Sequence, residues 1–592
     1  MALRSPPTAS LLSSLSASLL VPLSLSLLAL PALFRLHWLP LNVIPSSHAL
    51  LHFDETLQGL LPTIGFAVLT FFGTLVVVGA CRETFQQRGF SGRDLLKPGS
   101  THKVPESQGL PACCVYLLAL FCFIPFRYYL GSEGKEQSPQ TTSENGGWSG
   151  DMTGRQGFPH HELATYLSAL LSLLSSLILG FCDDVFDIRW RFKMPIPIIS
   201  SIPMLLVYYA GRGGTGLVVP GWPGWLRTAV GSRVVDLGLF YYVYMALLSV
   251  FCTHSINILA GINGVEVGQA LIIAFSLCLN DALYLPFTSA LLSKEKTADI
   301  YWLSSVNPIQ NELVGRHLFS LSLMLPLVGT CAGLLAWNRH PSLVFVGDTF
   351  CYFAGQALAC AGVLGHFSKT LLLFFLPQVF NFLLSCPQLF GFVPCPRHRV
   401  PGVHAETGGL YPSVAVFSSR KRIGTLGTGM LLILEGLGLV KLFREGEMRK
   451  VETRLASEGK GFRQGKGQGQ EQGKGQGQGS RRIVGTTNLT LLNSLLVLKG
   501  ARTPLEHVLN ELRKSEVATS STSTTTSSSS SPGGSQVALL PIPPPSSSAT
   551  GNGSVHIDEP RLWRLAMGTQ LAGSALAFAV RYWAAAIVFP DQ

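Results

Sequence analysis

Long apolar runs separated by shorter polar segments dominate the chain. A membrane-spanning helix needs about 20 mostly apolar residues, and ten runs of roughly that length occur. They lie near residues 58–80, 111–130, 163–181, 195–210, 237–259, 268–290, 317–337, 350–366, 369–391 and 566–589. We therefore predict an all-α polytopic membrane protein with about ten transmembrane helices.

A further run at residues 10–34 is rich in Leu and Ser and is interrupted by Pro22 and Pro31. Its composition fits a cleaved signal peptide, a signal anchor or an extra span. The pattern does not choose among these three, and all three remain open at this point.

The composition agrees with a membrane protein. Hydrophobic residues make up 47% of the chain and charged residues only 13%, whereas a soluble globular protein carries about 25% charged residues. The formal net charge is +11. The positive-inside rule and anionic cytosolic lipid account for this charge, so we expect no nucleic-acid partner.

Basic loops set the orientation. If the ten spans alternate, the basic segments 81–110, 182–194 and 392–560 fall on one side of the membrane, which the positive-inside rule makes cytosolic. The opposite loops also carry Arg212 and Arg227, so the bias is moderate.

The chain divides into five parts along its length. An N-terminal extension covers 1–57, a nine-span core 58–391, a cytosolic loop 392–454, a low-complexity cytosolic region 455–560, and the last transmembrane helix 561–592. The low-complexity region holds a Gly/Gln/Lys-rich stretch and a Ser/Thr-rich stretch. Such compositions cannot bury enough apolar surface to offset the entropy of ordering.

Carboxylates stand at the end of the predicted span 163–181. Asp183 and Asp184 are adjacent, Asp187 follows, and Lys193 closes the segment. Such carboxylates repel one another unless a cation or proton intervenes, and magnesium with a phosphate substrate would resolve the repulsion. The alternative interpretation is a solvated helix end.

Other polar residues stand at span ends on the same predicted side. Asn257 and Asn263 lie beside Gly261 and Gly264 at one span end, and Asp348 stands where a new span begins. Each has an ordinary explanation, namely an interhelical hydrogen bond for the amides and a helix N-cap for the acid.

Arg397, His398 and Arg399 follow the predicted span 369–391. Arginine suits phosphate and sugar oxygens, although a positive-inside anchor would also explain this run. Together, acids, amides and bases from four separate loops indicate one site for a metal ion and a multiply charged anion beside lipid. A phosphate transfer to a membrane-borne acceptor fits such a site.

Several sequence motifs resemble one enzyme family. These are the PESQG run from Pro105, the DDxxDxRWRxK run from Asp183, the run Asn257–Gly264, the FVGDTFCYFAG run from Phe345, the GHFSKT run from Gly365 and the PCPRHR run from Pro394. The chain resembles the polyprenyl-phosphate N-acetylhexosamine-1-phosphate transferases of glycosyltransferase family 4. The PCPRHR run favours the eukaryotic branch. The resemblance covers about 58–445 and resumes near 487–493 and 561–590.

The resemblance implies a ten-span enzyme of the endoplasmic reticulum membrane, with cytosolic catalytic loops and inhibition by tunicamycin. It implies transfer of GlcNAc-1-phosphate from UDP-GlcNAc to dolichyl phosphate, giving dolichyl-diphosphate-GlcNAc and UMP, the first step of lipid-linked oligosaccharide synthesis for N-glycosylation. Mg²⁺ would be the cofactor, membrane lipid would surround the site, and we expect a homodimer.

The resemblance also assigns roles by position. Asn257 and Asp348 match magnesium-contacting positions, and Asp183, Asp184 and Lys193 match the catalytic positions beside the reacting phosphates. The substrate-binding positions are Glu106, Asp187, Trp190, Asn263, Phe345, Arg397, His398 and Arg399. Direct attack by the acceptor phosphate and a two-step route through an aspartyl-phosphate both remain open.

Three other interpretations compete with this one. A transporter would carry its charged residues near the membrane midplane and show internal repeats, whereas here they gather at one face. A related enzyme would use another sugar nucleotide or polyprenol, and the PCPRHR run argues against it. An inactive scaffold is disfavoured because Asp183, Asp184, Asn257 and Asp348 are all present.

Overall fold

The computed structural model describes most of the chain. The described residues are 48–97, 102–128, 160–219, 221, 224–285, 308–396, 399–404, 407–417, 423–457, 482–521 and 556–584. The apolar run at 10–34, the stretch 458–480 and most of 516–550 lie outside them.

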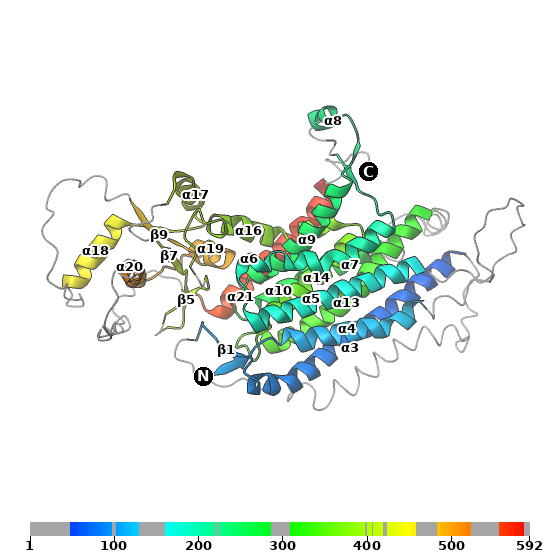
Figure 1. The fold of residues 1–592 in the computed structure, drawn as a ribbon, viewed down its shortest axis with the longest axis horizontal. Coiled ribbons are helices and arrows are strands. Elements are labelled where there is room, and N and C mark those ends of the chain that lie inside the picture. The colour runs from blue at the N-terminus through cyan, green and yellow to red at the C-terminus, as the bar shows by residue number, and fades with distance from the viewer. Residues whose placement is uncertain are drawn as a thin grey trace, which may run out of the picture.

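A bundle of long helices forms the body of the protein (Figure 1). Its members are α3 (His48–Gln87), α4 (Gly109–Tyr128), α5 (His160–Phe186), α7 (Ile196–Ala210), α9 (Leu239–Ile258), α10 (Val265–Ala282), α13 (Pro308–Asn338), α14 (Gly347–Leu364), α15 (Ser368–Phe374), α16 (Leu376–Leu389) and α21 (Glu559–Ala579), which ends in the π-helical turn η3 (Val580–Ala584). The short helix α6 (Trp190–Lys193) follows α5, and α8 (Gly224–Val230) precedes α9.

Each of the ten predicted spans overlaps one of these helices, but fewer than ten helices qualify as spans. Within the described ranges, six are long and apolar enough to cross a membrane, or seven if α15 and α16, bent by 72°, count as one span. The helix α7 has only 15 residues. Asp348 and Gln356 make α14 more polar, and Glu559 begins α21. The structure therefore shows a polytopic helical protein without fixing ten spans.

Small residues allow the helices to pack closely. A Cβ atom on Gly333 of α13 would come within 2.7 Å of the Phe71 carbonyl oxygen of α3. A Cβ atom on Gly355 of α14 would come within 2.6 Å of the Thr253 backbone nitrogen of α9. Glycine at such positions lets helix backbones approach one another inside a membrane.

Polar groups also join helices inside the bundle. The Thr70 hydroxyl donates a 2.9 Å hydrogen bond to the Pro326 carbonyl of α13, and the Trp337 indole donates one of 3.1 Å to the Leu75 carbonyl of α3. The Gln378 amide donates to Gln269 at 2.9 Å. In a medium without water, such bonds satisfy polar groups that would otherwise be costly to bury.

Short strands add a feature that the all-α prediction did not include. The strand β9 (Ile483–Thr487) pairs antiparallel with β7 (Val414–Val416) and β8 (Leu442–Arg444). The other described strands form two-stranded sheets, namely β1 (Ser91–Arg93) with β2 (Lys103–Pro105), β3 (Gly216–Val218) with β4 (Val234–Asp236), and β5 (Gly402–Val403) with β6 (Leu410–Tyr411).

The three-stranded sheet and four helices form a unit at one end of the bundle (Figure 1). These helices are α17 (Thr425–Gly436), α18 (Glu445–Ser457), α19 (Leu491–Leu498) and α20 (Leu505–Ser521). The central strand comes from the predicted low-complexity region, so a short ordered segment there completes a sheet whose outer strands lie before it.

Candidate active site

Asp184 fixes the beginning of α14. One Asp184 carboxylate oxygen accepts the Asp348 backbone N–H at 2.6 Å, and the other accepts the Thr349 hydroxyl at 2.5 Å. The first N–H groups of a helix lack intrahelical partners, and a carboxylate satisfies them and suits the helix dipole. Asp184 thus acts as an N-terminal cap supplied by another helix, and it holds Asp348 in position.

Gly347 makes this contact possible. Its φ of +74° is accessible to glycine at little cost. A Cβ atom there would overlap the Asp184 carboxylate. Glycine is therefore required both for the turn into α14 and for the approach of Asp184.

Asp183 and Asp348 hold Lys193 between them. The Lys193 ammonium lies 3.0 Å from the Asp183 carboxylate and 2.8 Å from that of Asp348. The Asp183 side chain is fully buried, and its other oxygen accepts the Ile188 N–H at 3.2 Å. Burial alone would lower the pKa of Lys193, but the two carboxylates raise it above its ordinary value. Lys193 therefore stays charged.

Asn257 completes the cluster from a third element. Near the end of α9, its amide nitrogen donates a 3.0 Å hydrogen bond to Asp348. One Asp348 carboxylate oxygen therefore accepts a hydrogen bond from Lys193, and the other accepts one from Asn257. Its side chain remains 28% exposed, which sets it apart from the fully buried Asp183.

A cleft of about 240 Å³ opens beside this cluster. Asn257 and Asp348 line one part of it. Asn263, Phe345 and Asp94 are among the residues that line the remainder. The cleft therefore brings a charged end, an amide and an aromatic ring into one space, a combination that suits a ligand with an anionic part and a planar part.

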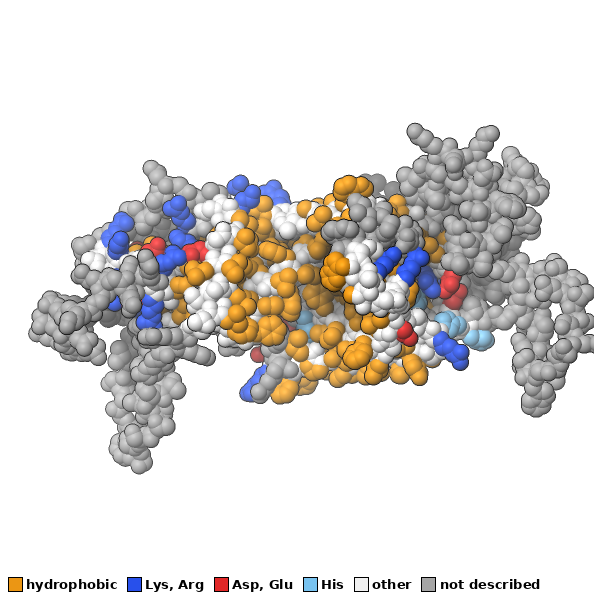
Figure 2. Space-filling model, turned by 90° about the horizontal axis from the view of Figure 1, so that it is seen from above, with side chains coloured by type: hydrophobic (Ala, Val, Ile, Leu, Met, Phe, Trp, Pro, Cys, Tyr) orange, Lys and Arg blue, Asp and Glu red, His pale blue; other side chains and the backbone are white. Residues whose placement is uncertain are grey.

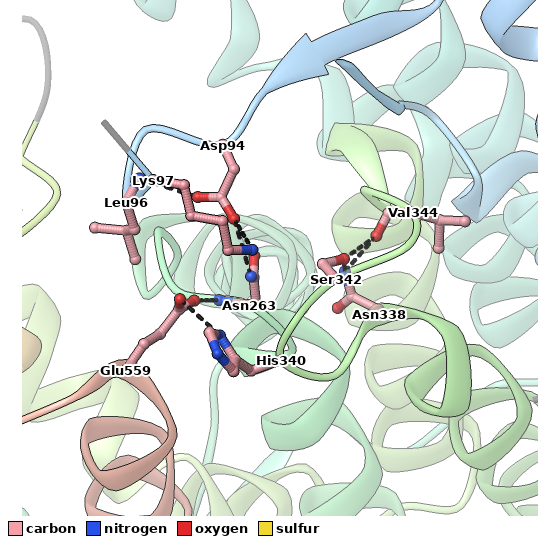
Figure 3. A network of polar contacts seen from close by, with 9 residues as sticks. All are labelled: Asp94, Leu96, Lys97, Asn263, Asn338, His340, Ser342, Val344 and Glu559. Carbon is pink, nitrogen blue, oxygen red and sulfur yellow. Dashed lines mark hydrogen bonds and ion pairs between the residues drawn. The ribbon is translucent and has the colours of Figure 1, made fainter. Parts of the chain in front are cut away.

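A network of polar contacts supports the Asn263 end of the cleft (Figure 3). The Asn263 side-chain nitrogen donates to Asp94 at 3.1 Å, and its backbone N–H donates to Glu559 at 2.7 Å. Glu559 also contacts His340 at 2.8 Å, and Asp94 pairs with Lys97 at 2.6 Å. The loop that carries Asn263 is thus held from two sides.

Asp94 is kept ionised by this network. Burial alone would raise its pKa, but the Lys97 ammonium and the Asn263 amide hold it below its ordinary value. An ionised carboxylate can only accept hydrogen bonds. Asn263 must therefore turn its NH₂ group toward Asp94, which directs its amide oxygen away from that carboxylate.

Glu106 approaches the cluster from the segment between β2 and α4. The Gly109 N–H donates to the Val346 carbonyl at 2.9 Å, and the Phe345 N–H donates to the Pro105 carbonyl at 2.7 Å. These bonds fasten the segment to the residues that precede α14. Burial raises the pKa of Glu106, and the Asp184 charge raises it further.

Arg399 lies in the unit at the end of the bundle. Its carbonyl accepts the Asn493 side-chain amide at 2.9 Å. Its Nη1 atom is buried and has no hydrogen-bond partner among the described residues. Val400, the next residue, lines the cleft and packs against Gly261. A buried guanidinium nitrogen without a partner is costly and suits an anionic or sugar oxygen.

The structure brings together most of the predicted site residues. Asp183, Asp184, Lys193, Asn257 and Asp348 form one connected cluster, and Asn263 and Phe345 line the adjoining cleft. Asp187 has an exposed side chain with no described contact to the cluster, and only its backbone N–H reaches it, donating to the Asp183 carbonyl at 3.0 Å. Arg397, His398 and the side chain of Trp190 lie outside the described residues.

Sequence reasoning missed four residues of the site, namely Asp94, Glu266, His340 and Glu559. Glu266 lines the cleft and accepts the Gly261 N–H at 3.4 Å. The only available signal was their acidic or polar character close to span ends, which does not identify a partner.

The donor set can accommodate a magnesium ion only with help from substrate. In the part of the chain that the structure describes, no group of three or more His, Cys, Asp or Glu side chains could hold a metal ion. The Asp348 carboxylate and the Asn257 amide oxygen offer hard ligands side by side. Mg²⁺ commonly takes one or two protein ligands and completes its shell with water and substrate phosphates, so these two residues fit.

Comparison with known proteins gives consistent matches. The model of glycosyl transferase family 4 matches residues 166–366. The UDP-N-acetylglucosamine–dolichyl-phosphate N-acetylglucosaminephosphotransferase of Saccharomyces cerevisiae is 42% identical over 363 residues, which cover 60% of this chain and 74% of that protein. The chain belongs to glycosyl transferase family 4.

Two further relatives carry the same name. The enzyme of Schizosaccharomyces pombe is 44% identical over 359 residues, covering 61% of this chain and 74% of the relative. That of Dictyostelium discoideum is 42% identical over 341 residues, covering 57% and 74%. The family model spans the whole Asp183–Lys193–Asp348–Asn257 cluster, so the cluster lies inside the part of the chain that defines the family.

Proposed function

We propose that this chain transfers GlcNAc-1-phosphate from UDP-GlcNAc to dolichyl phosphate, giving dolichyl-diphosphate-GlcNAc and UMP. Family membership and the names of relatives that are 42–44% identical support this activity. The observation that carries it is the bridging of Asp183 and Asp348 by Lys193 at the edge of the cleft. This reaction would begin the lipid-linked oligosaccharide for N-glycosylation.

The bond changes follow from the substrates. An oxygen of dolichyl phosphate attacks the β-phosphorus of UDP-GlcNAc and forms a new P–O bond. The bond from that phosphorus to the bridging oxygen breaks, and UMP leaves with the electron pair. Lys193 lies where it can offset negative charge on the diphosphate, and Asp183 and Asp348 orient its ammonium.

Asn257 and Asp348 would hold Mg²⁺, together with oxygens of the substrate phosphates. When bound, the ion would offset the charge of the diphosphate and its leaving group. Asp184 keeps Asp348 in place through the cap on α14, so it serves as a positioning residue for this ligand.

The contacts that occupy the oxygens of the paired acids support direct transfer over an aspartyl-phosphate route. Asp183 is fully buried with both oxygens engaged, and Asp184 accepts hydrogen bonds from Asp348 and Thr349. A carboxylate nucleophile needs a free oxygen facing the phosphorus. Asp348 is more exposed, but Lys193 and Asn257 occupy its oxygens.

We extend the proposal to the membrane location, the orientation and the oligomeric state of the protein. The chain would lie in the endoplasmic reticulum membrane with about ten spans and the cluster facing the cytosol, because the basic loops adjoin the cluster. Tunicamycin would inhibit it, and it would form a homodimer. For these points the support is the charge pattern and the family resemblance.

The deciding experiment is an assay on membranes that contain the full chain. UDP-GlcNAc labelled in the sugar is supplied with Mg²⁺ and dolichyl phosphate, with and without tunicamycin, and the lipid extract is analysed. We expect labelled dolichyl-diphosphate-GlcNAc that is lost with Asp348→Ala and retained with Asp236→Ala, an exposed acid outside the cleft. Product formed only with another sugar nucleotide or a bacterial polyprenyl phosphate would point to a related transferase.

A further inference from the structure

The helix α17 carries an apolar face that no described part of the protein covers. Ile433 is 65% exposed, Leu437, just after the helix, 63%, and Leu426 56%. These residues are spaced by seven and four positions, so they lie on one side of the helix. A water-facing helix of this length would ordinarily present polar residues there.

The opposite side of α17 faces the protein. Leu431 is buried in a small core with Val440 and Leu442. The only charged residue of the helix, Glu435, pairs with Arg444 of β8 at 2.7 Å. The outward face of the helix therefore carries no charge.

The apolar face of α17 continues the lipid-facing surface of the bundle. A Cβ atom on Gly427 of α17 would come within 2.6 Å of the Phe392 carbonyl oxygen, just past the end of α16. Phe390 and Phe392 are 66% and 43% exposed, and Leu383 on α16 is 61% exposed. Figure 2 shows the hydrophobic side chains of this side as one band extending from the helical bundle toward the end unit.

We propose that α17 lies in the membrane interface, with Leu426, Ile433 and Leu437 inserted among the acyl chains of the bilayer. Its 12 residues span about 18 Å, too short to cross a bilayer. Helices with an apolar face that lie in the interface plane insert that face among the upper acyl segments.

This contact would tie the end unit to the membrane. The Glu435–Arg444 pair joins α17 to β8, and β8 pairs with β9. Beyond β9, Asn493 holds the Arg399 carbonyl at 2.9 Å. Insertion of α17 thus fixes the height of the Arg399 segment above the bilayer. The inference about α17 itself does not depend on the proposed reaction.

The test uses the full chain in nanodiscs of phosphatidylcholine and phosphatidylserine. A photoreactive benzophenone amino acid replaces Ile433, Leu437, Leu383 or Arg449, one per variant, and irradiated protein is analysed by mass spectrometry. Leu383 on α16 is the lipid-facing control, and Arg449 on α18, 74% exposed, is the water-facing control. These exposed positions tolerate a larger side chain.

We expect phospholipid adducts at positions 433 and 437 at a yield within a few-fold of that at position 383, and none at 449. Adducts joining position 433 to a protein, either a second copy or another chain, would overturn the proposal. The absence of phospholipid adducts at positions 433 and 437, as expected at position 449, would also overturn the proposal.

Discussion

The backbone amide of Asp348 donates a 2.6 Å hydrogen bond to the Asp184 carboxylate, which lies 164 residues earlier in the chain. One acid of the site therefore sets the position of another. The helix dipole of α14 favours a negative charge at this point. The paired acids consequently have different tasks, since Asp184 orients α14 while Asp183 orients Lys193.

Removing the charge of this cap should impair catalysis through Asp348. Asp184→Asn keeps the shape but removes the charge and replaces one of the two acceptor oxygens by an NH₂ group, which cannot accept a backbone N–H of α14. We expect kcat to fall by roughly a hundredfold, because a catalytic group displaced by about 1 Å can lose that much. Thr349→Val removes one supporting bond, and we expect a smaller loss, about tenfold. Thr428→Val on α17, whose hydroxyl bonds only within its own helix, is the control. Equal activity in Asp184→Asn and wild type would contradict the cap.

Lys193 should matter for both stability and activity. Lys193→Met leaves the fully buried Asp183 without its cation, which should cost about 3 kcal/mol of folding free energy. The double variant Asp183→Asn with Lys193→Met should recover most of the melting temperature that the single variant loses. The single and the double variant should both be inactive. Lys499→Met at an exposed position is the control. An active double variant would show that Lys193 serves the fold alone.

Asp94 should govern which base the cleft accepts, if Asn263 reads the uracil. Its carboxylate draws the Asn263 NH₂ group toward itself and leaves the amide oxygen to accept a donor such as the uracil N3–H. Asp94→Asn permits the opposite orientation, so we expect UDP to bind roughly tenfold more weakly and the preference for UDP over CDP to narrow. Calorimetric titration of both nucleotides measures this, with Asp236→Asn as control. An unchanged UDP/CDP ratio would separate Asp94 from base recognition.

Glu106 should make the protein less stable as pH rises. Its pKa is raised in the folded protein by burial and by Asp184. The folded state therefore binds the proton more tightly than the unfolded state, and stability is lost as pH rises from the unfolded pKa of about 4.3 through the higher folded pKa. Glu106→Gln should raise the melting temperature at pH 7 relative to wild type, and the difference should shrink toward pH 4.5. Glu447→Gln, at an exposed position, should show no such trend. If Glu106→Gln melts at the same temperature as wild type at every pH, the pKa of Glu106 is not raised in the folded protein.

Magnesium removal should abolish the transfer, and Asn257 should set the concentration required. Chelation by EDTA should stop product formation and added Mg²⁺ should restore it. Asn257→Ala should raise the Mg²⁺ concentration for half-maximal activity at least about tenfold. Asn510→Ala, on α20 away from the cleft, should leave it unchanged. If Asn257→Ala lowers kcat without altering the Mg²⁺ dependence, the amide positions Asp348 and does not ligate the ion.

Hydropathy and local spacing determined where helices form and which ends are polar. Each of the ten predicted spans overlaps a helix, because the apolar character of a continuous segment is a local property of the sequence. The number of spans was less predictable, since a break such as the 72° bend between α15 and α16 depends on packing. The sheet was missed because its central strand, β9, follows a low-complexity stretch and finds both partners far away in the chain.

The sequence by itself also determined which chemical groups the candidate site holds, because Asp183, Asp184, Lys193, Asn257 and Asp348 are ionisable or amide groups at span ends. Only the tertiary structure decided their partners. Asp184 caps α14, Lys193 bridges two acids, and the Asn263 loop bonds to Glu559, 296 residues later. Residue type specifies what a side chain can donate or accept. Which donor meets which acceptor depends on how distant helices pack.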